Sequence, residues 1–373
     1  MKRLHTAFLL SVLTCAAPLA AAAQTAIPKT YVVGQDFGSV RDYYLSKCCT
    51  QPDGVTTYLS LYDLLDPHGY GGLGMDERGQ PAADADWGSG PISAYKSATG
   101  LPVTSLAIGL SITETGHTGA LKRVADGTFD AEIDQLARFI GRARQTVYLR
   151  IGYEFDGPWN DGYGNPQNYV AAWRHIVDRL RSHKLDNVRF VWQASCSPLA
   201  GQIRGKHQDI SQWYPGDAYV DVAAMSWFIN PDRPVAADTS GFQPLTQGQL
   251  RDELVAFAEA HHKPVMIAES SPQGYDLKAH TRSNITQFYG GKPGSGTTKV
   301  DDDALWADWY QPLFDYLNAH PDVRILAYIN ADWDAQAMWG KPYSSGYWGD
   351  SRLQDNAVIA QKWNAAVAQW KAR

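Results

Sequence analysis

The sequence predicts an α/β protein with the architecture of a (β/α)8 TIM barrel in a single domain. Eight short apolar runs follow one another along the chain, and stretches with helical spacing of apolar residues lie between several of them. Short apolar runs fit strands that are buried on both faces of a parallel sheet. Alternating strands and helices imply parallel strands with helices outside. Eight such units in about 350 residues suit a closed barrel.

The eight runs are rich in β-branched and aromatic residues. In chain order they are Tyr31–Phe37, Val55–Leu61, Val103–Leu110, Val147–Phe155, Val188–Ala194, Val220–Phe228, Pro264–Ser270 and Val323–Asn330. Helical spacing recurs around Leu136, Trp173, Leu254 and Leu313. An open doubly wound sheet is the alternative, but GQDFGSV after the first run lacks the G-x-G-x-x-G spacing of a phosphate-binding turn.

The N-terminal segment Met1–Ala23 has the composition of a signal peptide. Lys2 and Arg3 precede a short apolar run, and the alanine-rich stretch that follows offers a cleavage site near Ala23. The run is too short to span a bilayer. We therefore expect a secreted or periplasmic protein, whose residues 24–373 form the barrel domain.

Composition limits the partners. The 33 Lys and Arg residues against 39 Asp and Glu residues give a net charge of −6, which argues against nucleic acid, and against a membrane once the signal peptide is cleaved. The 13 Trp and 20 Tyr residues suit a surface that binds flat, half-apolar ligands such as sugars. Oligomeric state cannot be deduced from the sequence.

Cysteine spacing argues against a metal site, since the chain has no C-x-x-C motif and no His/Cys ligand spacing. We expect no metal and no cofactor. Beyond the predicted signal peptide, Cys48, Cys49 and Cys196 remain. A bridge of Cys196 to one of the neighbours, a bridge between the adjacent pair, and three buried thiols are all compatible with this count.

Two glutamates lie at the ends of two of the predicted strands. Glu154 and Glu269 lie one residue before the ends of the fourth and seventh runs, and the C-terminal ends of barrel strands converge on one mouth. A partly buried carboxylate needs a compensating partner, and a structural salt bridge to Arg150 is the alternative explanation for either residue. Two carboxyls facing each other suit glycoside hydrolysis, in which one holds a proton and the other stays ionised.

The segments around these glutamates resemble a known enzyme group. The sequences YLRIGYEFDGPWN, YVAAWRHIVDRLR and KPVMIAESS are similar to the retaining glycoside hydrolases of clan A, and most of all to family twenty-six, the β-mannanases and related β-glycanases. This resemblance implies that Glu154 is the acid/base and Glu269 the nucleophile, and that Trp333 matches a tryptophan near the cleaved sugar. The chain departs from the pattern at Tyr153, where Asn or His is usual, and at Ser226–Phe228, where Tyr or His is usual.

Other residues near strand ends are candidates for substrate binding. A Trp or Tyr ring can stack on a sugar face, and polar side chains can bind its hydroxyls. The candidates are Tyr153, Trp159, Trp227, Trp333, Asp36 and Asn230. For Asp36 and Asn230, a role as a cap or turn residue is the alternative.

The sequence thus predicts a secreted retaining glycoside hydrolase that acts on a polysaccharide or oligosaccharide of the β-mannan, β-glucan or xylan type. A non-catalytic carbohydrate-binding barrel and a polysaccharide lyase are the alternatives, and Tyr153 keeps both open. The sugar, the linkage and the choice between endo and exo action do not follow from the residues.

Overall fold

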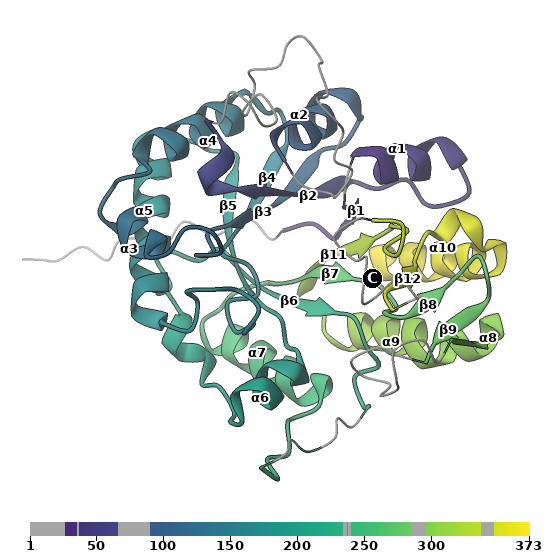
Figure 1. Cartoon of the computed structure of the whole chain (residues 1–373). Coiled ribbons are helices and arrows are strands. Elements are labelled where there is room, and N and C mark those ends of the chain that lie inside the picture. The colour runs from purple at the N-terminus through teal and green to yellow at the C-terminus, as the bar shows by residue number, and fades with distance from the viewer. Residues whose placement is uncertain are drawn as a thin grey trace, which may run out of the picture.

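A closed barrel of eight parallel strands forms the centre of the computed structural model, which describes residues 27–35, 37–65, 90–233, 237, 240–284, 296–336 and 347–373 (Figure 1). Around the barrel the strand order is β1-β11-β7-β6-β5-β4-β3-β2, and β1 pairs with both β11 and β2. The strands are β1 (Thr30–Gly34), β2 (Gly54–Ser60), β3 (Ser105–Ser111), β4 (Thr146–Ile151), β5 (Val188–Ala194), β6 (Val222–Trp227), β7 (Val265–Ser270) and β11 (Val323–Ile329). Each overlaps one of the eight predicted runs and begins within a residue or two of its start, so the predicted (β/α)8 barrel is confirmed and the open sheet is excluded.

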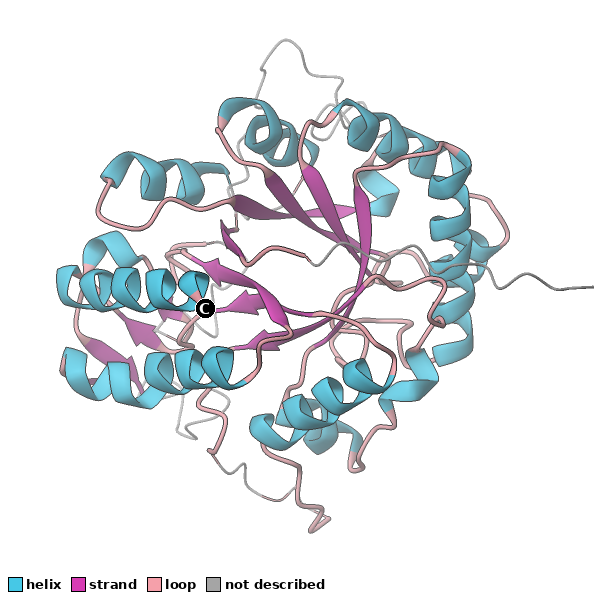
Figure 2. Cartoon of the chain, turned by 180° about the vertical axis from the view of Figure 1, so that it is seen from behind, coloured by secondary structure: helices cyan, strands magenta, loops and turns pink. Residues whose placement is uncertain are grey.

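Helices surround the barrel (Figure 2). They are α1 (Phe37–Ser46), α2 (Pro91–Gly100), α3 (Ala120–Ala125), α4 (Asp130–Arg142), α5 (Pro166–Ser182), α6 (Pro198–Arg204), α7 (Gln247–Ala260), α8 (Asp302–Leu305), α9 (Gln311–Ala319) and α10 (Ala357–Ala372). A π-helical turn, Trp306–Tyr310, joins α8 to α9. Apolar helix faces and outward-facing strand residues form one large core, in which Trp173 and Trp309 are buried as their helical spacing suggests. Among the described residues, no helix has the length and apolar character needed to cross a bilayer.

The inside of the barrel has two layers. Residues near the middle of the strands form an apolar layer, made of Val32, Ala107, Tyr148, Val191, Val222, Ala224, Met266, Ala268, Ile325 and Ala327. Toward the C-terminal ends lies a polar layer of buried, mutually hydrogen-bonded side chains, made of Thr56, Arg150, Gln193, Ser226 and Glu269. Because side chains alternate along a strand, Arg150 faces inward two residues after Tyr148, and Gln193 does so two residues after Val191.

A β-bulge lies between β6 and β7 next to this polar layer. Met225 pairs with Ile267, but the next residue, Ser226, pairs with Glu269, so β7 carries one extra residue, Ala268. Strict alternation from Met266 and Ala268 would turn Glu269 outward, toward the helices. The bulge instead lets Glu269 join the inward-facing set, an effect that bulges produce beside active sites.

A smaller sheet covers one side of the barrel mouth. It consists of β8 (Tyr275–Asp276), β9 (Thr281–Ser283), β10 (Thr297–Lys299) and β12 (Gly349–Asp350), in the order β10-β9-β8-β12. The strands come from the segments that follow β7 and β11, and β12 runs parallel to β8. Gly349 takes a φ of +84°, and a Cβ there would lie 2.0 Å from the carbonyl oxygen of Tyr275, so glycine permits this pairing.

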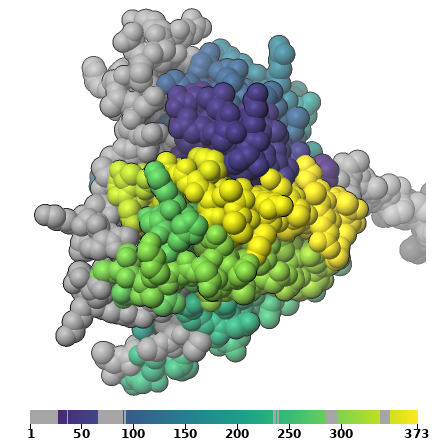
Figure 3. Space-filling model, turned by 90° about the vertical axis from the view of Figure 1, so that its right-hand side faces the viewer, coloured from purple at the N-terminus to yellow at the C-terminus, as the bar shows by residue number. Residues whose placement is uncertain are grey.

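The last helix closes the barrel against its first strand. Trp363 of α10 donates its indole N–H to the hydroxyl of Tyr31 at 3.1 Å, and Lys29 donates to the carbonyl of Trp370 at 2.7 Å. The first and last parts of the chain therefore lie side by side, as the purple and yellow segments of Figure 3 show.

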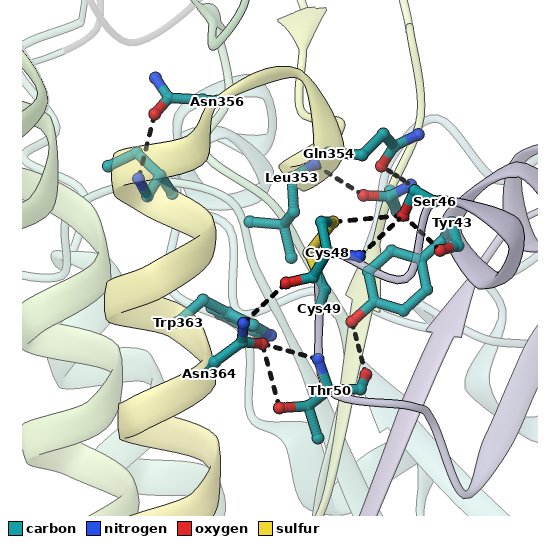
Figure 4. Close-up of a disulfide and its surroundings, with 12 residues drawn as sticks. Tyr43, Ser46, Cys48, Cys49, Thr50, Leu353, Gln354, Asn356, Trp363 and Asn364 are labelled. Atoms are coloured by element: carbon teal, nitrogen blue, oxygen red, sulfur yellow. Dashed lines mark hydrogen bonds between the residues drawn. A yellow bond between two sulfur atoms is a disulfide. The ribbon is translucent and has the colours of Figure 1, made fainter.

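A disulfide joins the adjacent residues Cys48 and Cys49 in the loop between α1 and β2, whereas Cys196 is a buried free thiol. Asn364 of α10 donates to the carbonyl of Cys48 at 2.9 Å and accepts from the N–H of Thr50 at 2.6 Å (Figure 4). This loop joins a helix to the start of a strand, so it lies at the opposite end of the barrel from the polar layer.

Candidate active site

Glu154 lies three residues beyond the end of β4, in a tight turn. Its φ is +54°, a left-handed conformation that costs a non-glycine residue roughly 1–3 kcal/mol. Hydrogen bonds to its backbone carbonyl oppose this cost: the N–H of Gly157 and the side-chain amide of Asn160 both donate to it at 2.9 Å. The turn therefore holds the Glu154 carboxyl in one place at the mouth of the barrel.

The two carboxylate oxygens of Glu154 have different partners. The hydroxyl of Ser226, on β6, lies 2.8 Å from Oε1, and the indole N–H of Trp159 donates to Oε2 at 2.8 Å. The Trp159 ring lies against the backbone of Gly157, where a Cβ would be only 2.5 Å from the indole. Glycine at position 157 thus lets the ring fold back over the carboxyl.

Glu269, on β7, forms a buried ion pair. The Arg150 guanidinium donates from Nη1 to Glu269 Oε1 at 2.6 Å and from Nη2 to the Thr56 hydroxyl at 2.9 Å. A guanidinium is always charged, so it compensates a negative charge on Glu269. The salt bridge that the sequence offered as an alternative to catalysis is therefore present, and it involves one of the two glutamates.

A chain of hydrogen bonds connects the two glutamates. The side-chain amide nitrogen of Gln193, on β5, lies 3.1 Å from Glu269 Oε1 and 3.1 Å from the Ser226 oxygen, which in turn lies 2.8 Å from Glu154 Oε1. The Oε1 atoms of Glu154 and Glu269 can therefore be no farther apart than the sum of these three distances. That limit lies within the spans that glycoside hydrolases use, about 5–9.5 Å.

Burial and mutual repulsion separate the roles of the two groups. Burial, followed by the charge of Glu269, raises the pKa of Glu154 to about 8, although the hydrogen bonds from Ser226 and Trp159 act in the opposite direction. Glu154 is therefore protonated at neutral pH, while Glu269 faces a permanent cation. A proton donor and a charge-compensated carboxylate at one mouth are the two groups that glycoside cleavage requires.

Two tyrosines enclose the ion pair. The rings of Tyr58 and Tyr153 meet edge to face at 5.4 Å, and the Arg150 guanidinium lies 4.8 Å from the first ring and 5.4 Å from the second. Burial and the charge of Glu269 raise the pKa of both phenols, so both stay neutral. Gly109 on β3 makes room for this group, because a Cβ there would lie 2.6 Å from Tyr58 and 3.0 Å from Arg150.

The structure places two of the predicted residues at this site and a third at the same end of the barrel. Tyr153 packs against the ion pair. Trp159 donates to the Glu154 carboxyl, and 42% of its surface is exposed to solvent. Trp333 lies beyond the end of β11 and is buried, with its ring stacked on Trp348 and its indole N–H donating to Ser351 at 3.0 Å. It lies at the same end of the barrel as the two glutamates.

Two other candidate residues make their contacts elsewhere, and one falls outside the described residues. Trp227 is completely buried under the guanidinium of Arg251, 3.8 Å from the ring centre, because its side chain points outward to α7 and α9. Asn230 uses its amide nitrogen to bind the carbonyl of Asp308 at 2.7 Å and its amide oxygen to cap a turn, as the alternative interpretation proposed. Asp36 is not among the described residues.

Sequence reasoning missed three polar residues of the site, Thr56, Gln193 and Ser226. Each is a polar residue inside an apolar run, in the sequences VTTYL, FVWQA and AAMSW. A buried polar side chain needs a hydrogen-bonding partner. A polar residue at a strand position that alternation turns toward the inside of the barrel was therefore the available signal. That signal does not identify the hydrogen-bonding partner of each residue.

A comparison with known proteins finds a family that this chain resembles. Residues 109–272, which contain both glutamates and the strands between them, match the model of glycosyl hydrolase family 26. Over these residues the chain is similar to this family. The resemblance predicted from the segments around Glu154 and Glu269 is therefore confirmed, and family 26 is a family of glycoside hydrolases.

Two curated relatives match most of the chain. A β-1,3-xylanase, TXYA, of a Vibrio species is 35% identical over 345 residues, which are 91% of this chain and 64% of the relative. A β-1,3-xylanase of an Alcaligenes species is 34% identical over 337 residues, 89% of this chain and 61% of that protein. The chain thus spans less than two thirds of the length of either relative.

Solved structures of family 26 share the fold. The catalytic domain of the endo-β-1,4-mannanase of Bacillus sp. JAMB-750 superposes with a TM-score of 0.52 at 14% identity, covering 92% of this chain and 89% of that one. The family 26 domain of an endo-β-mannanase/endo-β-glucanase of Prevotella bryantii gives 0.51 at 10% identity, covering 91% and 89%. At these identities the likeness concerns the barrel alone.

Proposed function

We propose that this protein hydrolyses β-1,3-linked xylan by a retaining double displacement between Glu154 and Glu269. The observation that carries the reaction type is the pairing of a buried carboxyl whose pKa is about 8 with a carboxylate held by Arg150, joined through Ser226 and Gln193. The substrate is proposed from the two β-1,3-xylanases that share about a third of their residues with this chain.

In the first step, Glu154 transfers its proton to the glycosidic oxygen. The bond between that oxygen and the anomeric carbon breaks, and its electrons stay with the leaving sugar. A carboxylate oxygen of Glu269 forms a bond to the anomeric carbon on the opposite face. Arg150 and Gln193 hold Glu269 in line for this attack, because both donate to it from fixed positions in the polar layer.

In the second step, the ionised Glu154 removes a proton from water. The water oxygen bonds to the anomeric carbon, the ester bond to Glu269 breaks, and Glu154 is protonated again. Two inversions restore the original configuration. A pKa near neutrality suits a group that serves as acid in one step and base in the next.

Two alanine variants assign the two roles. We expect Glu269→Ala and Glu154→Ala each to lose at least about 1000-fold in turnover. Azide added to Glu269→Ala takes the place of the nucleophile and gives a glycosyl azide of inverted configuration. Azide added to Glu154→Ala attacks the glycosyl-enzyme and gives the retained configuration. Glu259→Ala, on the exposed face of α7, is the matched control; activity near that of the wild type in either catalytic variant contradicts the mechanism.

A substrate panel tests the sugar and the linkage. We expect oligosaccharides from β-1,3-xylan and little release from β-1,4-xylan, β-1,4-mannan or β-1,3-glucan, measured as reducing ends and identified by chromatography. Release from mannan alone would overturn the substrate assignment. Binding without release would identify a carbohydrate-binding barrel, and an unsaturated product that absorbs in the ultraviolet would identify a lyase.

We also propose that Met1–Ala23, which lies outside the described residues, is removed during export to the periplasm or the medium. N-terminal sequencing of the protein recovered from those fractions of an expressing bacterium tests this. A mature chain that still begins at Met1 contradicts it.

A further inference from the structure

Arg150 determines which atoms donate and which accept in the hydrogen bonds between the two glutamates. A guanidinium can only donate, so the atom of Gln193 that lies 2.9 Å from Arg150 Nη1 must be the amide oxygen. The amide nitrogen therefore faces Ser226 and Glu269, each at 3.1 Å. The Glu269 carboxylate only accepts, so it too requires the amide nitrogen of Gln193 to face it. Exchanging the amide oxygen and nitrogen would break the hydrogen bonds to both Arg150 and Glu269.

The direction passes on through Ser226 to the acid. Its hydroxyl oxygen accepts from Gln193, so its hydrogen donates to Glu154 Oε1 at 2.8 Å. Both oxygens of Glu154 therefore accept from one donor each: Oε1 from Ser226 in the buried polar layer, and Oε2 from the indole N–H of Trp159 at 2.8 Å. The Ser226 hydrogen is held on Oε1 by the chain of bonds that starts at Arg150. Trp159, in contrast, is 42% exposed and its N–H can turn away, so Oε2 is the oxygen that can carry the proton of Glu154.

A similar asymmetry holds at Glu269. Arg150 and Gln193 both donate to Oε1, at 2.6 and 3.1 Å. Within the part of the chain that the structure describes, no hydrogen bond reaches Oε2. A lone pair on Oε2 is therefore free to attack, whereas those on Oε1 are engaged by two donors.

We propose that Gln193 and Ser226 are positioning residues that select one oxygen of each catalytic carboxyl, so that Oε2 of Glu154 gives the proton and Oε2 of Glu269 attacks the sugar. This inference rests on the proposed function. As the proton leaves Oε2, the Ser226 hydrogen still donates to Oε1 and stabilises the carboxylate that forms. Gln193 acts on both carboxyls, and Ser226 acts on the acid alone.

The two residues therefore have separable effects. Removing the Ser226 hydroxyl takes away a donor to the ionised acid, which raises the pKa of Glu154 further. The titratable groups that face Glu154 are Glu269 from β7, Tyr153 and Asp156 from its own turn, and Cys196 from beyond β5. Ser226→Ala alters none of them, so a shift in the pH profile reports the lost hydroxyl.

The experiment compares two substrates that differ in their need for an acid. One is an unsubstituted β-1,3-xylotriose, and the other is a 2,4-dinitrophenyl β-xylobioside, whose leaving group departs without protonation. For Ser226→Ala we expect kcat/KM to fall about 10- to 100-fold on the trisaccharide and to stay within about threefold on the aryl glycoside. We expect the alkaline limb of its pH profile on the trisaccharide to move to higher pH.

Two further variants complete the design. Gln193→Met, which removes the amide and keeps the length of the side chain, should lower kcat/KM on both substrates because Glu269 also loses a donor. Ser270→Ala is the matched control: Ser270 is equally buried and adjacent to Glu269, but its hydroxyl donates to the Ala327 carbonyl at 2.8 Å. It should leave both rates and the pH profile near those of the wild type.

Retained aryl-glycosidase activity in Ser226→Ala also shows that this variant folds. Equal losses on the two substrates, or an alkaline limb that does not move, would overturn the role of Ser226. Gln193→Met with the substrate pattern of Ser226→Ala would overturn the role of Gln193 at Glu269. A wild type that cleaves neither glycoside would overturn the proposed function itself, which distinguishes that failure from failure of the positioning residues.

Discussion

The two layers inside the barrel are built on the same strands and have opposite characters. On β4, Tyr148 lies in the apolar layer and Arg150 in the polar layer; on β5, Val191 and Gln193 are divided in the same way. The apolar layer is held by close packing and the polar layer by directed hydrogen bonds. One step of two residues along a strand therefore separates the part of the barrel that supports the fold from the part that carries the chemistry.

The difference also determines what each layer tolerates. A packed apolar side chain loses contacts gradually as its volume shrinks. A buried ion pair does not lose stability gradually, because removing one partner leaves the other charge uncompensated. Arg150 is fully buried and binds Thr56, Gln193 and Glu269, so the polar layer depends on this one residue.

Arg150→Met should give the largest effect, because it breaks the polar layer at its centre. Glu269 loses its compensating charge and Gln193 loses the donor that orients its amide. We expect unfolding by urea to show a loss of about 3–5 kcal/mol. We also expect activity on β-1,3-xylan to fall below detection, even at temperatures where circular dichroism shows a folded protein.

Arg150→Lys separates charge from geometry. It keeps a positive charge but offers a single ammonium in place of a planar fork. We expect it to regain part of the stability and little of the activity. Full activity in this variant would contradict the view that the positions of the hydrogen bonds, and not the charge alone, matter in the polar layer.

Met266→Ala tests the apolar layer on β7, the strand that also carries Glu269. Met266 is fully buried, so the cavity should cost about 2–5 kcal/mol, measured as a lower midpoint in urea. We expect kcat/KM of the folded protein to stay within about threefold of the wild type. Loss of activity at unchanged stability would show that the two layers are not separable.

The pH dependence of activity gives the smallest of these effects and concerns the polar layer alone. Because Glu154 must be protonated to act as the acid, kcat/KM should fall about tenfold for each pH unit above its pKa of about 8. Glu269→Gln removes the negative charge that helps to hold the proton, so the pKa of Glu154 should fall in this variant. Carbon-13 NMR of labelled glutamate measures that change without activity, and an unchanged pKa would contradict the electrostatic coupling.

The barrel could be predicted from the sequence because its signal is repeated eight times and each run is apolar for the same physical reason. The two glutamates could be singled out because strand ends converge in a barrel, so position along the strand was sufficient. The aromatic residues were harder. Trp159 follows the end of β4 and Trp227 is the last residue of β6, yet Trp159 lies beside Glu154 and Trp227 lies under Arg251 on the outer side of the barrel.

Which side of the strand a residue faces is the information that the sequence lacked. Alternation gives it for Arg150 and Gln193, but one extra residue in β7 reverses it for Glu269, and no local signal marks that residue. Hydrogen-bond partners across strands, such as Ser226 with Glu154, depend in addition on the register between strands, which is a property of the closed sheet.

The extra alanine in β7 has a consequence for how such an enzyme changes over generations. Deleting the single codon for Ala268 would restore strict alternation along β7, with Met266 inward, Ile267 outward and Glu269 inward, so the carboxylate would keep its side of the sheet. The bulge accommodates one surplus residue, and Glu269 would still face inward without both the residue and the bulge. A descendant whose seventh strand is one residue shorter would thus keep its two glutamates on the inside of the barrel.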